Sequence, residues 1–252
     1  MSKKSFFESN NPMMKDDVYR KTSDNVLDGE LVYSGEMMTV NGAVNKTFVL
    51  ASIALATTLV SYIFPSMFLA FTGMIGGAIV YFLTSRSPEK SPTLAPIYAA
   101  LEGLLVGSMS AFYAYAYEGI IFMAVTLTFA ILFTMLMLYK SGIIKVTERF
   151  RSIVMTAVGA IMLLYLASLV LFFFGIDMPF LHDRSPIGIG ISLLIVGVAS
   201  MKLLIDFDNF YKGEQLKTPA YMEWYFGMGL LFTMIWLYLE IMWLLSNLLG
   251  GE

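Results

Sequence analysis

The stretch GIIFMAVTLTFAILFTMLMLY, residues 119–139, contains no charged side chain and decides the fold class. A helix of about 20 apolar residues has the length needed to cross the hydrocarbon core of a bilayer. Because lipid offers no hydrogen-bonding partners, such a segment must satisfy its backbone groups internally, as a helix does. The stretch therefore predicts a membrane-spanning helix.

Six more apolar runs of similar length lie on either side of this stretch. The seven runs are approximately Thr47–Phe64, Ser66–Thr84, Leu94–Ala116, Gly119–Tyr139, Ser152–Gly175, Ile187–Ile205 and Trp224–Leu248. The chain is 58% hydrophobic and 14% charged, with a mean hydropathy of +0.72, which is more apolar than a soluble domain. We therefore expect an all-α integral membrane protein with seven transmembrane helices in a lipid bilayer. Gly73 with Gly77, and Gly103 with Gly107, have the spacing that lets helices approach closely.

Residues 1–46 are polar and mixed in charge, which predicts a largely flexible N-terminal tail before a transmembrane domain at residues 47–252. The tail lacks the early apolar run of a cleavable signal peptide, so we expect the first span to act as the insertion signal. Fourteen of the sixteen Lys and Arg residues precede span one or lie between spans two and three, four and five, or six and seven. The positive-inside rule then predicts a cytoplasmic N-terminus and a C-terminus outside.

Few ionisable residues lie within the spans, where a charge is costly and usually functional. They are Glu102, Lys202, Asp206, Asp208 and Glu240. Glu102 and Glu240 are expected near the midplane, as buried carboxyl groups that exchange protons at weakly acidic to neutral pH. Lys202 and Asp206 are four residues apart on one helix, a spacing at which they can pair. Asp208 is expected close to the headgroup region.

Other residue types exclude several kinds of chemistry. The chain has no cysteine, and a net charge of -3 gives no basic field for nucleic acid. The single histidine, His182, is expected in an outer loop, which leaves a rhomboid-like protease without its intramembrane histidine. Asp206 does not follow the Gly-x-Gly of an intramembrane aspartyl protease, and no His-Glu-x-x-His zinc motif occurs. We expect no enzyme and no cofactor.

Glu118 and Glu223, at span ends, are expected to be solvated.

Four short stretches carry a family resemblance. They are MTVNGAVNKT (38–47), APIYAALEGLLVG (95–107), IDFDNF (205–210) and WLYLEI (236–241). Together they resemble the Bax inhibitor-1 (transmembrane Bax inhibitor motif) family, in particular a bacterial branch. The resemblance implies a seven-helix fold whose last helix is central and surrounded by the other six. It also implies a pH-dependent calcium leak in the inner membrane, controlled by carboxylates at the positions of Asp206 and Glu240.

The sequence departs from this expectation in two ways. Glu240 stands where the family more often has Asp, so its carboxyl group has a longer reach. The apolar runs also place Asp206 near the cytoplasmic boundary and Glu240 slightly beyond the centre, too far apart for contact. Three explanations stay open: span six reaches deeper than hydropathy suggests, the last helix starts with an extramembrane turn around residues 221–226, or Glu102 is the partner of Glu240.

The leading hypothesis is a calcium leak channel gated by protonation of Asp206, Glu240 and Glu102. Deprotonated carboxylates supply the oxygen ligands that Ca²⁺ prefers, so Asp206 and Glu240 are candidates for transient Ca²⁺ binding. Lys202 and Asp208 are candidates for an ion pair or for the lining of the pore. The alternative is a non-conducting scaffold that binds a membrane protease or another membrane protein. A third hypothesis, a proton-coupled transporter, lacks the internal inverted repeat that would support it.

Overall fold

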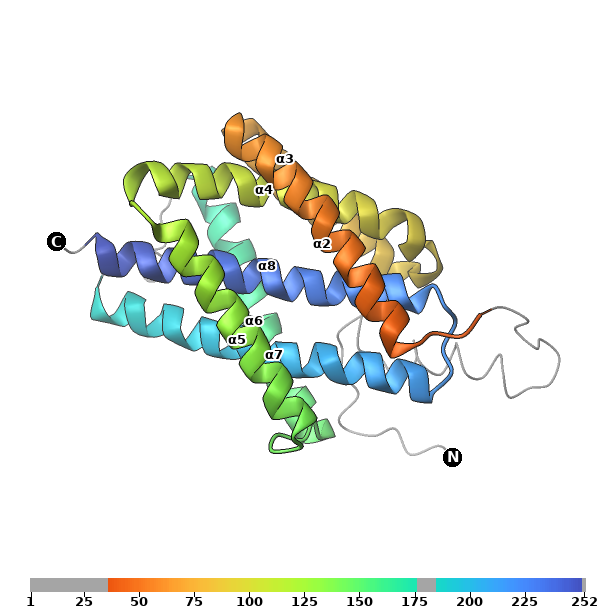
Figure 1. The fold of residues 1–252 in the computed structure, drawn as a ribbon. Coiled ribbons are helices and arrows are strands. Elements are labelled where there is room, and N and C mark those ends of the chain that lie inside the picture. The colour runs from red at the N-terminus through yellow and green to blue at the C-terminus, as the bar shows by residue number, and fades with distance from the viewer. Residues whose placement is uncertain (1–35, 176–184, 251–252) are drawn as a thin grey trace. The chain divides into compact units, whose positions relative to one another are not determined.

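The computed structural model describes residues 36–175 and 185–250, and within them the chain forms seven long α-helices (Figure 1). They are α2 (Val40–Ile63), α3 (Met67–Arg86), α4 (Ser91–Ala116), α5 (Ile120–Lys140), α6 (Glu148–Phe173), α7 (Pro186–Gln215) and α8 (Met222–Leu249), with a short 3₁₀ turn, η1 (Pro88–Lys90), before α4. All seven are long and apolar enough to cross a membrane, which confirms the predicted fold class. Most of the predicted flexible tail, together with His182, lies outside the described residues.

Two helices extend well past the apolar runs that predicted them. α2 begins at Val40 instead of Thr47, and α7 continues to Gln215 instead of ending at Ile205. Both extensions are polar, so hydropathy assigned them to loops, but their polar groups have partners inside the protein. Asp206 therefore lies well inside α7, and the three explanations left open above stay predictions.

The helices group into two compact units, of which the first contains α2, α3, most of α4, the end of α7 from Asp206 and the start of α8 to Phe232. Small residues bring its helices close together. A Cβ added at Gly103 or Gly107 would lie 2.3 Å or 2.2 Å from a backbone oxygen of α2, and one at Gly73 would lie 2.5 Å from a backbone oxygen of α4. The predicted close packing at these glycines is confirmed.

The start of α2 forms hydrogen bonds with the end of α7, the start of α8 and the loop between them. The Met38 N–H donates to the Thr218 carbonyl at 2.8 Å, and the Glu223 carboxylate accepts from the N–H and the hydroxyl of Thr39, at 3.0 and 3.2 Å. The Glu214 carboxylate accepts from the Val40 N–H at 3.0 Å. The expectation that Glu223 is solvated was wrong, because this residue is 9% exposed and caps the start of α2. Glu118 is exposed, as expected.

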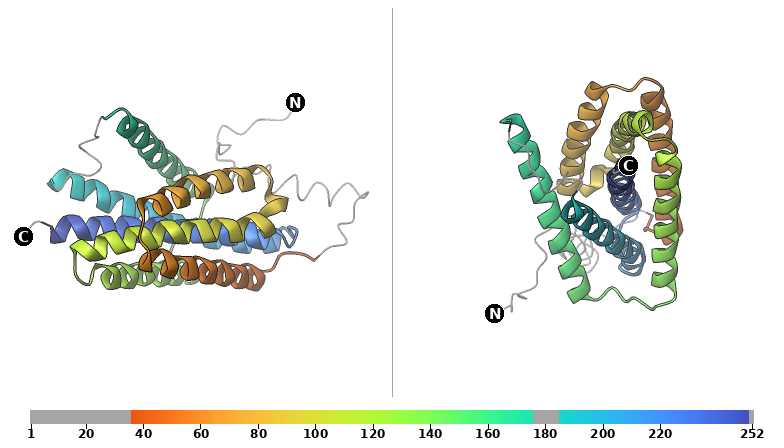
Figure 2. Two further views of the ribbon diagram at one scale, coloured as in Figure 1. Left: turned by 90° about the horizontal axis from the view of Figure 1, so that it is seen from above. Right: turned by 90° about the vertical axis from the view of Figure 1, so that its left-hand side faces the viewer.

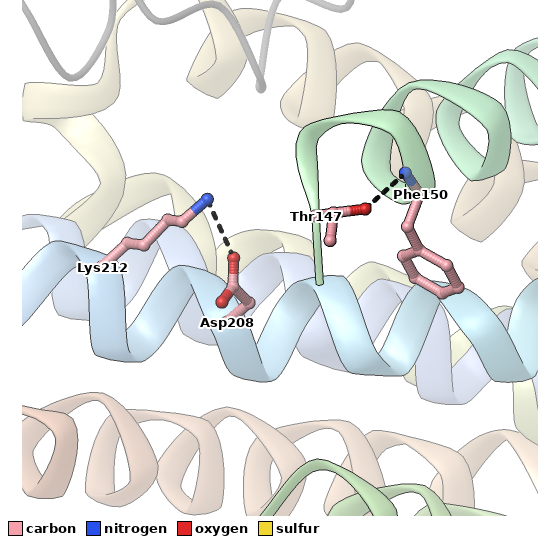
Figure 3. Close-up of polar contacts among 4 residues, drawn as sticks. All are labelled: Thr147, Phe150, Asp208 and Lys212. Atoms are coloured by element: carbon pink, nitrogen blue, oxygen red, sulfur yellow. Dashed lines mark hydrogen bonds and ion pairs between the residues drawn. The ribbon is translucent and has the colours of Figure 1, made fainter. Parts of the chain in front are cut away.

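The second unit contains the end of α4, α5, α6, α7 up to Ile205 and α8 from Thr233. In the right-hand view of Figure 2, α5 and α6 stand apart, and α7 lies between them. α6 begins after Thr147, whose hydroxyl accepts from the Phe150 N–H at 3.2 Å (Figure 3). The unit's core includes fully buried Ile120, Leu203 and Leu237.

Burial separates the helices into two groups. Half of the apolar window of α7 and half of that of α8 is buried, against 17% to 22% for α2, α3, α5 and α6. The thinly buried helices expose large apolar side chains, such as Phe68 at 76% and Phe122 at 77%. Such side chains suit a lipid environment. The heavy burial of α8 agrees with an enclosed last helix, and α7 is enclosed to the same extent.

Candidate functional site

Glu102 lies near the middle of α4 and is 8% exposed. Its carboxyl group rests against α3 where that helix has Gly77, since a Cβ added there would lie 2.7 Å from Glu102 Oε1. One turn earlier on α4, the buried Tyr98 hydroxyl is close enough to interact electrostatically with this carboxyl group, although the two do not form a hydrogen bond of ordinary geometry. Glycine at position 77 therefore makes room for the acidic side chain between two helices.

A pair of tyrosines connects the surroundings of Glu102 with those of Asp206. The rings of Tyr81 and Tyr98 are 6.1 Å apart, and the Tyr81 ring also lies 5.1 Å from that of Phe232. Asp206, 3% exposed, is within electrostatic range of the Tyr81 hydroxyl. In the first unit, the two predicted carboxyl groups thus share an aromatic neighbourhood.

Asp208 forms an ion pair with an adjacent cation. Its Oδ2 lies 3.2 Å from the Lys212 ammonium nitrogen, one turn further along α7 (Figure 3). The lysine is near the C-terminus of the helix, where a positive charge is favoured. This ion pair lies in the polar part of α7, past the end of its apolar run.

Glu240 lies on α8 in the second unit and is 8% exposed. Two neutral donors reach it: the Trp236 indole N–H, at 3.1 Å and from one turn earlier, and the Tyr165 hydroxyl from α6. Both donate to Oε1, and no hydrogen bond from a described residue reaches Oε2. The Tyr113 hydroxyl is within electrostatic range. The carboxyl group is thus held at one oxygen by uncharged groups.

Lys202 is 4% exposed and donates to the Thr233 hydroxyl at 2.9 Å. This contact links α7 to α8 inside the second unit. Asp206 is the partner that the sequence predicts for Lys202. It belongs to the first unit, and the pairing of Lys202 with Asp206 stays a prediction. The same holds for the partner of Glu240, because both candidates, Asp206 and Glu102, lie in the other unit.

A family model described as Bax inhibitor 1 like matches residues 3–250, nearly the whole chain. The chain belongs to this family. With seven helices suited to a bilayer, this Bax inhibitor 1 like protein is a multi-pass membrane protein. Searches of curated proteins and of solved structures gave no match.

Sequence reasoning found the acidic residues of this Bax inhibitor 1 like protein but missed their neighbours. Trp236 could have been found, because it precedes Glu240 by one helical turn and lies on the same face. Tyr165, Tyr81 and Gly77 come from other helices, and no spacing in the sequence connects them to a carboxyl group. Among the described residues, no group of three or more acidic or histidine side chains could hold a metal ion.

Proposed function

We propose that this protein is a pH-sensitive calcium leak channel, gated by protonation of buried carboxyl groups. One observation carries the proposal: Glu102, Asp206 and Glu240 lie on three different apolar helices, and each is at least nine-tenths removed from solvent. Carboxyl groups in such surroundings are costly to keep charged and usually serve transport or proton binding.

The surroundings of Glu102 and Glu240 favour a switch over a permanent ion pair. The polar groups beside them, Tyr98 for the first and Tyr165 with Trp236 for the second, carry no charge. Among the described residues no ion pair to either group is found, and a carboxyl group without one can change between its charged and neutral forms as the pH changes. Asp208, paired with Lys212, is the contrasting case.

Calcium enters this proposal as cargo. Ca²⁺ prefers several oxygen ligands, and a permeating ion must bind weakly enough to leave again. Charged carboxylates attract the ion to the pathway, and protonation removes that attraction. The proposal includes the bacterial inner membrane as location, with a cytoplasmic N-terminus and an external C-terminus, which the distribution of Lys and Arg supports.

Flux across liposomes tests this function. Purified protein is reconstituted into vesicles loaded with a calcium-sensitive dye, and Ca²⁺ entry is recorded between pH 5 and 8 (about the range in which buried carboxyl groups titrate). We expect pH-dependent entry that Glu240→Gln, Asp206→Asn and Glu102→Gln each flatten. Glu118→Gln, at an exposed position, is the matched control and should behave as the wild type does.

Two results would contradict the proposal. Unchanged pH dependence in all three buried variants would remove the gating role of the carboxyl groups. Absence of flux from correctly folded protein, together with a membrane protein that co-purifies in stoichiometric amounts, would instead favour the scaffold hypothesis.

A further inference from the structure

We propose that Tyr165 and Trp236 are positioning residues that set the pH at which Glu240 binds its proton. This inference rests on the proposed function only where ion flux is concerned, because it predicts a property of Glu240 that exists whether or not the protein conducts. Its basis is the geometry of the two hydrogen bonds in the second unit.

Both donors converge on a single oxygen of Glu240. Trp236 approaches Oε1 from the same helix, and Tyr165 approaches it from α6. Two donors from two helices fix the rotation of the carboxyl group, since a turn about its last torsion angle would break both bonds at once. Oε2 is then the oxygen that remains for a proton or an ion.

The protonation step follows from this asymmetry. Glu240 takes a proton from a hydronium ion, which leaves as water, the new O–H bond forms at Oε2, and Tyr165 and Trp236 keep their own protons throughout. Hydrogen bonds from neutral donors are stronger to a carboxylate than to a carboxylic acid, so both residues favour the charged form. Loss of either donor shifts the balance toward the protonated form.

The other polar groups near Glu240 in this unit do not donate a hydrogen bond to its carboxyl group in the part of the chain that the structure describes. Tyr113, on the end of α4, is a further titratable side chain within electrostatic range of Glu240. The buried cation of α7, Lys202, bonds to Thr233, about two turns before Glu240 on α8. The hydrogen bonds of Tyr165 and Trp236 are therefore the specific interactions through which this part of the chain acts on Glu240.

Infrared difference spectroscopy across a pH titration tests the inference without any need for ion flux. The C=O band of the protonated acid that disappears in Glu240→Gln reports the protonation of Glu240. In Tyr165→Phe and in Trp236→Phe, this band should reach half its height about one pH unit higher than in the wild type, the shift expected from one hydrogen bond to a charged group. Tyr115→Phe removes a hydroxyl from a fully exposed side chain and should leave the midpoint unchanged.

A measurement on the wild-type protein guards against variants that fail to fold. A tyrosine ring band should change at the same pH as the Glu240 band, because the Tyr165 hydroxyl loses its charged acceptor there. Unshifted Glu240 midpoints in folded Tyr165→Phe and Trp236→Phe, or a tyrosine spectrum that does not change with Glu240, would overturn the inference. A shifted midpoint in a protein without calcium flux would retain the inference and reject the leak channel.

Discussion

Gly77 illustrates how a single residue determines where a buried acid can lie. The three heavy atoms nearest to a Cβ placed there all belong to Glu102, and the closest is the carboxyl oxygen Oε1 at 2.7 Å. No side-chain carbon has room at that distance unless the carboxyl group moves. The absence of a side chain on α3 is thus a condition for the observed position of Glu102 on α4.

Gly77→Ala should therefore displace the Glu102 carboxyl group and lower the free energy of unfolding by about 1 kcal/mol or less, because the end of the Glu102 side chain can shift and Ala is the better helix former. Thermal or denaturant unfolding in detergent measures the loss. Gly197→Ala is the control, because a Cβ there meets nothing within 4 Å and Ala is the better helix former.

A double-mutant cycle separates this contact from general effects of a methyl group. In a Glu102→Ala background, Gly77→Ala should lose most of its cost, because the atoms that it would displace are gone. An equal penalty in both backgrounds would mean that Gly77 is required for some other reason than Glu102.

At the residue scale, the sequence identifies the buried acidic residues. It does not identify the side chains that surround them. Glu102, Asp206 and Glu240 were identifiable because a charge in an apolar run is conspicuous, and all three are buried. Their neighbours Gly77, Tyr81 and Tyr165 are ordinary residues of apolar helices. Only the packing of one helix against another gives them a role, and one sequence does not contain that information.

At the scale of elements, the start of α2 depends on acidic residues distant in the sequence. The first backbone N–H groups of a helix have no partner within the helix, and a negative charge nearby is favourable. Here the Glu223 carboxylate accepts from the Thr39 N–H, and the Glu214 carboxylate accepts from the Val40 N–H. The Thr39 hydroxyl accepts from the Gly42 N–H at 2.9 Å. The end of α7 and the start of α8 thereby hold α2 at its first turn.

Glu223→Ala should loosen this attachment, because it leaves the Thr39 N–H and hydroxyl without their acceptor. Amide hydrogen exchange over residues 38–42 should accelerate by about tenfold, which corresponds to a helix cap worth about 1.4 kcal/mol. Glu118→Ala, at an exposed loop position, should leave exchange in this segment unchanged. Equal exchange in the two variants would contradict the capping role.

The same contacts explain why the helix bounds were harder to predict than the helices themselves. Seven apolar runs predicted seven helices because the length and hydropathy of a span are local properties. The first turns of α2 and the last turns of α7 are polar, and Glu214, Glu223 and the Asp208–Lys212 pair supply partners for some of their charges and backbone groups. These partners are visible only after folding, except for Lys212, which is one turn from Asp208.

At the scale of the whole molecule, positive charge gathers at alternate helix ends. Lys140 ends α5, Arg149 and Arg151 lie in the first turn of α6, and Lys212 lies near the end of α7. These ends face one side of the membrane if each helix crosses it once. An excess of Lys and Arg marks the cytoplasmic side, so these ends are expected there.

The absence of cysteine from the chain makes this orientation directly testable. Glu118→Cys, between α4 and α5, introduces a thiol on the predicted outer side, and Ser141→Cys, between α5 and α6, introduces one on the predicted cytoplasmic side. Both positions are exposed. A maleimide that does not cross membranes should label Glu118→Cys in intact cells and Ser141→Cys only after permeabilisation.

The two thiols also control for each other, because α5 alone separates them in the chain. Exchanged labelling would mean an inverted protein, in which Lys and Arg do not govern insertion. Equal labelling in intact cells would mean that α5 does not cross the bilayer. That second result would contradict the seven-span topology, since α5 is the most apolar of the seven candidate helices, with a hydropathy of 2.5.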